Sequence, residues 1–203
     1  EPASVLCWRS GPPATVRGLL AAAASGRPLQ EGLYDCAAAR RLVAATLRDF
    51  APDVLVVQMV RCAWATEHGL VPAPPPLFDA IDAMSLHFGR AAAGAPAVLA
   101  PLLRREAARC RRRERSLAAH AGITTAVAAR DLEALGVPAD RGRVVPVSAR
   151  VWRGGGTQRD EPVVLLSGNL GYRPTVQGAL WFAREVWPDL RRAVPAARWV
   201  LAG

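Results

Sequence analysis

Short apolar runs alternate with longer helical stretches along this 203-residue chain, and this alternation limits the folds open to it. The run at 52–58, Pro-Asp-Val-Leu-Val-Val-Gln, is typical of a strand buried on both faces of a parallel sheet. Strands that alternate regularly with helices wind into an α/β domain. We therefore predict strands at 4–8, 52–58, 77–81, 123–127 and 143–147, and helices ending near 25 and covering 36–50, 84–93, 97–120 and 130–135. Asp35 is expected to cap the helix at 36–50.

A second α/β pattern follows a polar segment that contains three consecutive glycines, Gly154 to Gly156. Such a segment predicts a linker, so the chain divides into an N-terminal lobe at 1–148, a linker at 149–161 and the beginning of a second lobe at 162–203. In the second lobe we predict a buried strand at 163–167, a turn at 168–174, a helix at 175–194 and a strand at 198–202. We expect the start of the first lobe and most of the second to lie outside this sequence.

The basic residues are all arginines, and the formal net charge is +9. Seven of them lie between Arg104 and Arg115, together with two glutamates, on a predicted helix. One interpretation is a solvated helix with internal ion pairs such as Glu106 with Arg109. The alternative is contact with an anionic membrane surface. Nucleic acid is not expected as a partner, because the run has no interleaved aromatic residues.

Four cysteines are widely spaced, and the three histidines do not cluster with them. Structural zinc needs four close ligands, so we expect buried free thiols in a reducing cytoplasm and no metal site. No apolar run reaches the roughly 18 residues that span a bilayer. The expected location is cytoplasmic. If the arginine-rich helix contacts anionic lipid, the protein is expected to be peripheral on the inner face of the membrane.

The most specific sequence pattern covers Leu165–Pro195. Leu-Ser-Gly-Asn-Leu-Gly-Tyr-Arg-Pro-Thr, followed by Gly-Ala-Leu-Trp-Phe-Ala-Arg-Glu-Val-Trp-Pro, resembles the opening of the second lobe in family 4 (group 1) glycosyltransferases of the bacterial exopolysaccharide type. Thr175 stands where that branch usually has asparagine. Upstream, Leu77–Ser85 resembles the branch's D-x-x-D-x-x-S strand end, and Arg105–Glu114 resembles its Glu/Arg-rich helix. Arg143–Pro146 resembles the hinge motif, although Val-Ser-Ala-Arg replaces its Asn-Gly-Val-Asp.

This resemblance implies the GT-B fold, an α/β architecture of two Rossmann-like lobes with parallel sheets, here with the second lobe truncated. It implies retaining transfer of a sugar from a nucleotide-diphosphate sugar to a hydroxyl acceptor, lipid-linked or saccharide, in cell-surface polysaccharide or glycolipid synthesis. The acceptor is expected on the first lobe and the nucleotide-sugar on the second. The nucleotide-sugar is a co-substrate, and no cofactor or metal is expected.

The donor diphosphate is expected at the turn before the helix of the second lobe. Gly168 and Asn169 open this turn, and Arg173 supplies a cation, so together with the helix N-terminus they can stabilise a leaving phosphate. The alternative is an ordinary strand–helix turn with an exposed arginine.

Acceptor chemistry is expected at the end of the strand at 77–81. Asp82 is the candidate catalytic residue, which would orient or deprotonate the acceptor hydroxyl, with Ser85 and Arg61 as acceptor-binding residues. The alternative for Asp82 is a cap on the following helix, and Asp79 is expected to hold a loop.

Two other functions remain open at this stage. A nucleotide-sugar 2-epimerase would share the lobes but act without an acceptor. A truncated chain that lacks the family's downstream pair of glutamates would be an inactive binding fragment. A nicotinamide dehydrogenase is disfavoured, because no Gly-x-Gly-x-x-Gly follows a predicted strand.

Overall fold

The computed structural model describes residues 5–67, 75–148 and 161–203. Contacts divide the chain into two compact units, residues 1–149 and 150–203. Each unit is described by itself, and the predicted linker lies outside the described residues apart from its last position.

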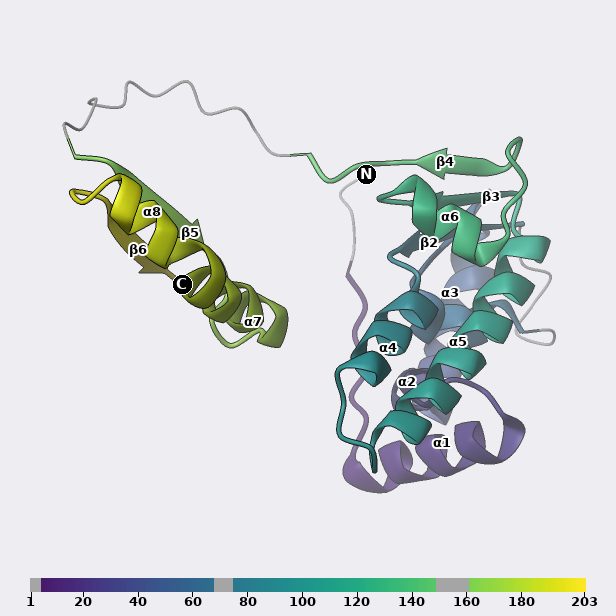
Figure 1. Cartoon of the computed structure of the whole chain (residues 1–203). Helices are drawn as coiled ribbons and strands as arrows, with labels where there is room; N and C mark the ends of the chain where they lie inside the picture. The colour runs from purple at the N-terminus through teal and green to yellow at the C-terminus, as the bar shows by residue number, and fades with distance from the viewer. Residues whose placement is uncertain (1–4, 68–74, 149–160) are drawn as a thin grey trace. The chain divides into compact units, whose positions relative to one another are not determined.

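A four-stranded parallel sheet forms the centre of the first unit (Figure 1). Its strands pair in the order β1-β2-β3-β4, and every pairing is parallel. The alternation of apolar runs and helices therefore correctly predicted an α/β unit with a parallel sheet. The strands are β1 (Leu55–Gln58), β2 (Pro76–Ile81), β3 (Ile123–Ala126) and β4 (Gly142–Val144).

Six α-helices and one 3-10 helix accompany this sheet in the described part of the first unit. Helices α4 and α5 pack side by side (Figure 1). The core between helices and sheet contains Phe78 of β2, Cys110 and Leu117 of α5 and Leu135 of α6. Helix α6 ends at Gly136, whose φ of 70° is in the left-handed region that favours glycine. The helices are α1 (Pro12–Ser25), α2 (Leu29–Tyr34), α3 (Ala37–Phe50), η1 (Val60–Thr66), α4 (Met84–Ala93), α5 (Ala100–His120) and α6 (Ala129–Leu135).

Three local predictions for the first unit are wrong. Residues 5–10 form no strand, so the strand predicted at 4–8 is absent from its described part. Strand β1 is buried on one face only: Val57 is 2% exposed and Val56 is 59% exposed, and these neighbouring side chains point to opposite faces of the sheet. The N-cap of α3 is Cys36, whose Sγ accepts a hydrogen bond from the Ala39 N–H, because arginine side chains engage the Asp35 carboxylate.

Helices α1 and α2 cross at a pair of glycines. A methyl group added at Gly32 would lie 2.7 Å from the carbonyl carbon of Gly18, 3.0 Å from Ala22 Cβ, and closer still to the Gly18 carbonyl oxygen. Only glycine permits this approach of the two backbones. The crossing brings Glu31 of α2 toward α5.

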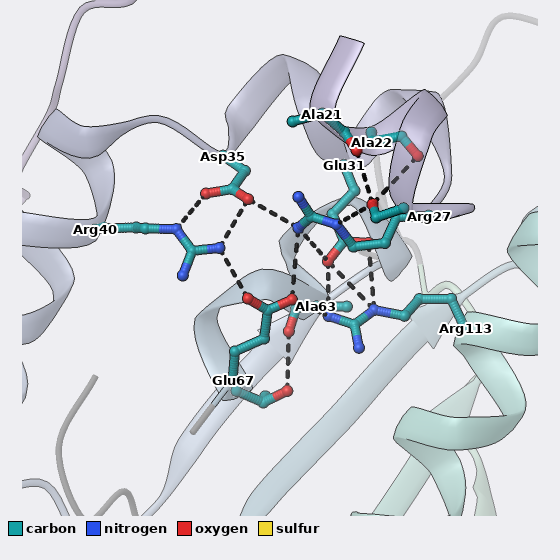
Figure 2. Close-up of polar contacts among 11 residues, drawn as sticks. Ala21, Ala22, Arg27, Glu31, Asp35, Arg40, Ala63, Glu67 and Arg113 are labelled. Carbon is teal, nitrogen blue, oxygen red and sulfur yellow. Dashed lines mark hydrogen bonds and ion pairs between the residues drawn. The ribbon is translucent and has the colours of Figure 1, made fainter. Parts of the chain in front are cut away.

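Three arginines and three carboxylates form one network that ties α2, α3, α5 and η1 together (Figure 2). Glu31 has no exposed surface, and its Oε1 lies 2.7 Å from Arg113 Nη2. Burial raises the pKa of Glu31, and the hydrogen bonds and charge of Arg113 offset this only in part. Burial also acts to raise the pKa of Asp35, but hydrogen bonds from Arg40 and Arg27 outweigh it and the pKa is lowered. The network's remaining carboxylate, Glu67, contacts all three arginines.

The second unit has two parallel strands and one long helical segment. Strands β5 (Val163–Ser167) and β6 (Arg198–Ala202) pair in parallel. Between them lie α7 (Arg173–Trp181), the π-helix η2 (Phe182–Val186) and α8 (Trp187–Ala193), close to the predicted helix at 175–194 but with a π-helical turn in its middle.

Aromatic side chains pack the helical segment of the second unit against its strands. The ring centroids of Phe182 and Trp187 lie 5.0 and 5.9 Å from that of Trp199 on β6. Trp181, by contrast, is 60% exposed and lies outside this core. Strand β5 was expected to be buried, yet Leu165 is 61% exposed, because alternate side chains of a strand point to opposite faces.

Candidate active site

The carboxyl edge of the four-stranded sheet gathers polar side chains from three neighbouring strands. Asp79, on the central strand β2, accepts a hydrogen bond from Thr125 Oγ1 of β3 at 2.8 Å. Its other oxygen accepts from Gln58 Nε2 of β1 at 3.2 Å. Asp79 therefore ties three strand ends together, which is a structural role at the edge where open α/β sheets bind ligands.

Two non-glycine residues at this edge have left-handed backbones. Met59, directly after β1, has φ 60°, and Ile81, the last residue of β2, has φ 56°. A β-branched residue in this region is a genuine outlier. Backbone hydrogen bonds hold both: the Met59 N–H donates to the Asp79 carbonyl at 2.8 Å, and the Ile81 carbonyl accepts from the Val127 N–H at 2.9 Å. Backbone strain of this kind clusters at functional sites.

Helix α4 begins at this edge without a local cap, because its N-cap, Ala83, has no side-chain acceptor. Two carboxylates from other helices take over that role. Asp131 of α6 accepts from the Ala83 N–H at 3.2 Å, and both oxygens of Glu114 of α5 accept from the Ser85 N–H at 3.3 and 3.4 Å. The carboxylates are 3% and 1% exposed. Burial raises the pKa of Glu114, while its hydrogen bonds to Ser85 act in the opposite direction.

These external caps leave Asp82 out of the helix terminus, so the alternative that Asp82 caps the following helix is wrong. The Asp82 side chain is exposed, and among the described residues it has no hydrogen bond or ion pair. The loop that carries it is fixed directly on its C-terminal side by Asp131 and Glu114. An exposed carboxylate on a backbone fixed in this way can accept a proton from a hydroxyl group within hydrogen-bond reach.

The two residues expected to bind the acceptor lie at the same edge but are less accessible. Ser85 lies in the first turn of α4, three residues after Asp82, and is 1% exposed, with its hydroxyl buried and unpartnered within the described part of the chain. Arg61 lies on η1, after the neighbouring strand. Its Nη2 donates to Met59 Sδ at 2.6 Å, and its guanidinium lies 5.9 Å from the Tyr34 ring centroid.

In the second unit, the predicted phosphate turn connects β5 to α7. The Gly168 N–H donates to the Ala202 carbonyl at 2.9 Å, so it extends the pairing of β5 with β6. Asn169 Oδ1 accepts from the Gly171 N–H at 2.8 Å, which closes a short turn. Arg173 is the first residue of α7 and is exposed. These three residues thus lie together on one turn, with the Arg173 cation facing solvent.

The roles of Glu114 and Asp131 were not predicted from the sequence. Glu114 was grouped with the arginines around it, and Asp131 has the appearance of an ordinary first-turn acidic residue. They act on Ser85 and Ala83, which lie 29 and 48 residues away along the chain. The available signal was the alanine at the N-cap of α4, because a buried helix end without a local cap needs an acceptor from elsewhere.

The described residues contain no group of three or more His, Cys, Asp or Glu side chains that could hold a metal ion. The four cysteines are free thiols; Cys110 is buried, as expected, but Cys7 is exposed. Burial raises the pKa of Cys110 to about 12. Of the helices in the described ranges, none has both the length and the apolar composition needed to cross a membrane.

No protein-family model matches the chain, and a search of the curated proteins finds no significant match.

Proposed function

We propose that this chain belongs to a GT-B glycosyltransferase that transfers a sugar, with retention, from a nucleotide-diphosphate sugar to a hydroxyl acceptor. The observation that carries the proposal is Asp82, an exposed carboxylate at the carboxyl edge of a parallel sheet, with buried carboxylates fixing the adjoining helix terminus. The resemblance of residues 165–195 to family 4 glycosyltransferases supports the same reaction. The acceptor, lipid-linked or saccharide, binds the first unit, and the donor binds the second.

In this reaction a bond forms between the acceptor oxygen and the anomeric carbon, and the bond between that carbon and the diphosphate oxygen breaks. Asp82 orients the acceptor hydroxyl and takes its proton. Negative charge develops on the leaving diphosphate. The N-terminus of α7 and the Arg173 cation, placed after the turn that Gly168 and Asn169 open, stabilise this charge, so the proposal requires no metal or cofactor.

Release of nucleoside diphosphate tests the proposal. The full-length protein is incubated with UDP-, GDP-, ADP- and dTDP-sugars, with and without a bacterial membrane-lipid extract. Release from one donor that rises with the extract is the expected result. A folded protein that releases nothing from any donor refutes the transferase. Consumption of UDP-GlcNAc without an acceptor, with an epimerised product, identifies a 2-epimerase instead.

Two matched variants test the role of Asp82. Asp82→Asn is expected to lower kcat by at least about 100-fold, the usual loss when a general base is removed. Asp49→Asn makes the same chemical change at an exposed position near the end of α3 and is expected to leave kcat unchanged. Equal kcat values for the wild type and Asp82→Asn would show that Asp82 is not the catalytic base. If both proteins still released nucleoside diphosphate, the proposal of a transferase would stand.

A further inference from the structure

Helix α5 separates its charges by sign. Its two glutamates, Glu106 and Glu114, are 6% and 1% exposed and point into the unit. Arg109 is also buried. Its guanidinium pairs with Glu106 at 3.4 Å, as predicted, and donates to the Ala23 carbonyl. Arg113 lies in the network with Glu31. The outer face of the helix therefore has cations and no carboxylate.

Five exposed arginines form this outer face, and we call them the arginine stripe: Arg104, Arg105, Arg111, Arg112 and Arg115. Residues three, four or seven positions apart lie on one side of a helix, and the stripe runs for about 17 Å at 1.5 Å per residue.

The charge of the arginine stripe is not compensated within the described part of the protein. Arg112 Nη2 donates to the Gly26 carbonyl at 3.3 Å, and Arg115 Nε donates to the Ala134 carbonyl at 3.4 Å. Carbonyl groups carry no net charge. No carboxylate in the described ranges lies within 4.0 Å of a stripe guanidinium. The internal ion pairs expected for this run are therefore found on the inner face, as Glu106 with Arg109, whereas the outer face is exposed and has no ion pair within the described ranges.

An apolar group adjoins the N-terminal end of the stripe. Val98, Leu99 and Leu102 are 87%, 50% and 55% exposed. Leu102 and Arg105 are three residues apart, so they lie on the same side of α5. Exposed aliphatic side chains next to a row of cations are typical of surfaces that bind the interface of an anionic membrane.

We propose that the arginine stripe, with Val98, Leu99 and Leu102 at its end, is a docking surface for an anionic lipid bilayer. The arginines attract the lipid phosphates, and the aliphatic side chains enter the boundary between headgroups and acyl chains. A single-stranded nucleic acid would call for aromatic side chains on which bases stack, and the stripe has none. The inference rests on α5 alone and does not require glycosyltransferase activity.

Vesicle co-sedimentation tests this surface. The wild-type protein is expected to bind vesicles of phosphatidylcholine with phosphatidylglycerol, and to bind phosphatidylcholine alone far more weakly. Each arginine near an anionic surface strengthens binding roughly fivefold, so replacing Arg104, Arg105 and Arg111 together by Gln is expected to weaken it roughly 100-fold. Glutamine keeps the helix, and circular dichroism checks that the variant is folded.

The matched control replaces Arg17, Arg48 and Arg90, which are also exposed, by Gln. It removes the same charge from α1, α3 and α4 and is expected to bind vesicles within twofold of wild type. Equal weakening in both triple variants would show that net charge alone drives binding and would overturn the proposal. Failure of the wild type to bind anionic vesicles at low salt would overturn it too, and stripe-dependent binding of RNA without vesicle binding would assign the surface to nucleic acid.

Discussion

The glycine crossing of α1 and α2 gives the sharpest test of the packing. In Gly32→Ala, the new methyl group would lie 2.7 Å from the Gly18 carbonyl carbon, whereas carbon atoms pack at about 3.5–4.0 Å. The obstacle is backbone, so no rotamer change can relieve it. The two helices must therefore separate by about 1 Å, which also moves the neighbouring Glu31 away from Arg113.

The magnitude follows from two opposing effects. Overpacking costs about 1–3 kcal/mol, with the upper end expected where backbone meets backbone, and alanine returns up to about 1 kcal/mol of helix propensity. We expect a net loss of about 2 kcal/mol in the free energy of unfolding, which lowers the Tm by about 4–8 °C. Urea unfolding and thermal melts followed by far-UV circular dichroism measure both quantities.

Gly89→Ala is the matched control. Gly89 lies in α4, and a methyl group there would meet no atom within 4 Å. The same substitution should therefore raise the free energy of unfolding by about 0.5–1 kcal/mol. If Gly32→Ala were as stable as the wild type while Gly89→Ala behaved as expected, the close crossing of α1 and α2 would be refuted.

Two further predictions concern buried groups. Burial raises the pKa of Glu114, so its ionised form destabilises the folded state. As the pH falls through the raised pKa toward 4.5, the value of an unperturbed glutamate, the folded state takes up a proton. The free energy of unfolding of the wild type should therefore rise relative to that of Glu114→Gln over this pH range. Urea unfolding of both proteins across that pH range measures their free energies of unfolding, and a wild-type value that stayed constant or fell relative to the variant's as the pH fell would contradict the burial of the charge. The exposed Cys7 should react rapidly with a thiol reagent at pH 8, whereas Cys110, with its pKa near 12, should react only after unfolding. Mass spectrometry of the labelled peptides identifies each thiol, and rapid native labelling of Cys110 would show that the core opens.

Secondary structure was predictable where local chemistry decides it. The apolar run of β2 and the glycine that ends α6 are local signals, and both elements were found. Helix α2 was missed because its six residues are too few to show a helical period. The strand expected at 4–8 failed because an apolar run forms a strand only where a neighbouring strand can pair with it.

The candidate site was predictable only in its exposed part. Asp82 follows a strand end, and this position is visible in the sequence. Its supports are not, because Asp131 and Glu114 reach the loop from helices far along the chain. The two faces of α5 were equally hidden: the sequence shows arginines and glutamates mixed together, and only packing against α1, α2 and α4 turns the glutamates inward.

The six-residue ionic network also has a consequence for the order of events during synthesis. Glu31 pairs with Arg113, which is 82 residues later in the chain. A ribosome adds about 5–20 residues per second, so Arg113 is synthesised roughly 4–16 seconds after Glu31. Glu31 is fully buried in the folded chain, and a buried unpaired carboxylate is costly. Helix α2 therefore reaches its final packing against α5 only after Arg113 has been made, although Glu31 can pair before that with Arg27, four residues earlier in the chain.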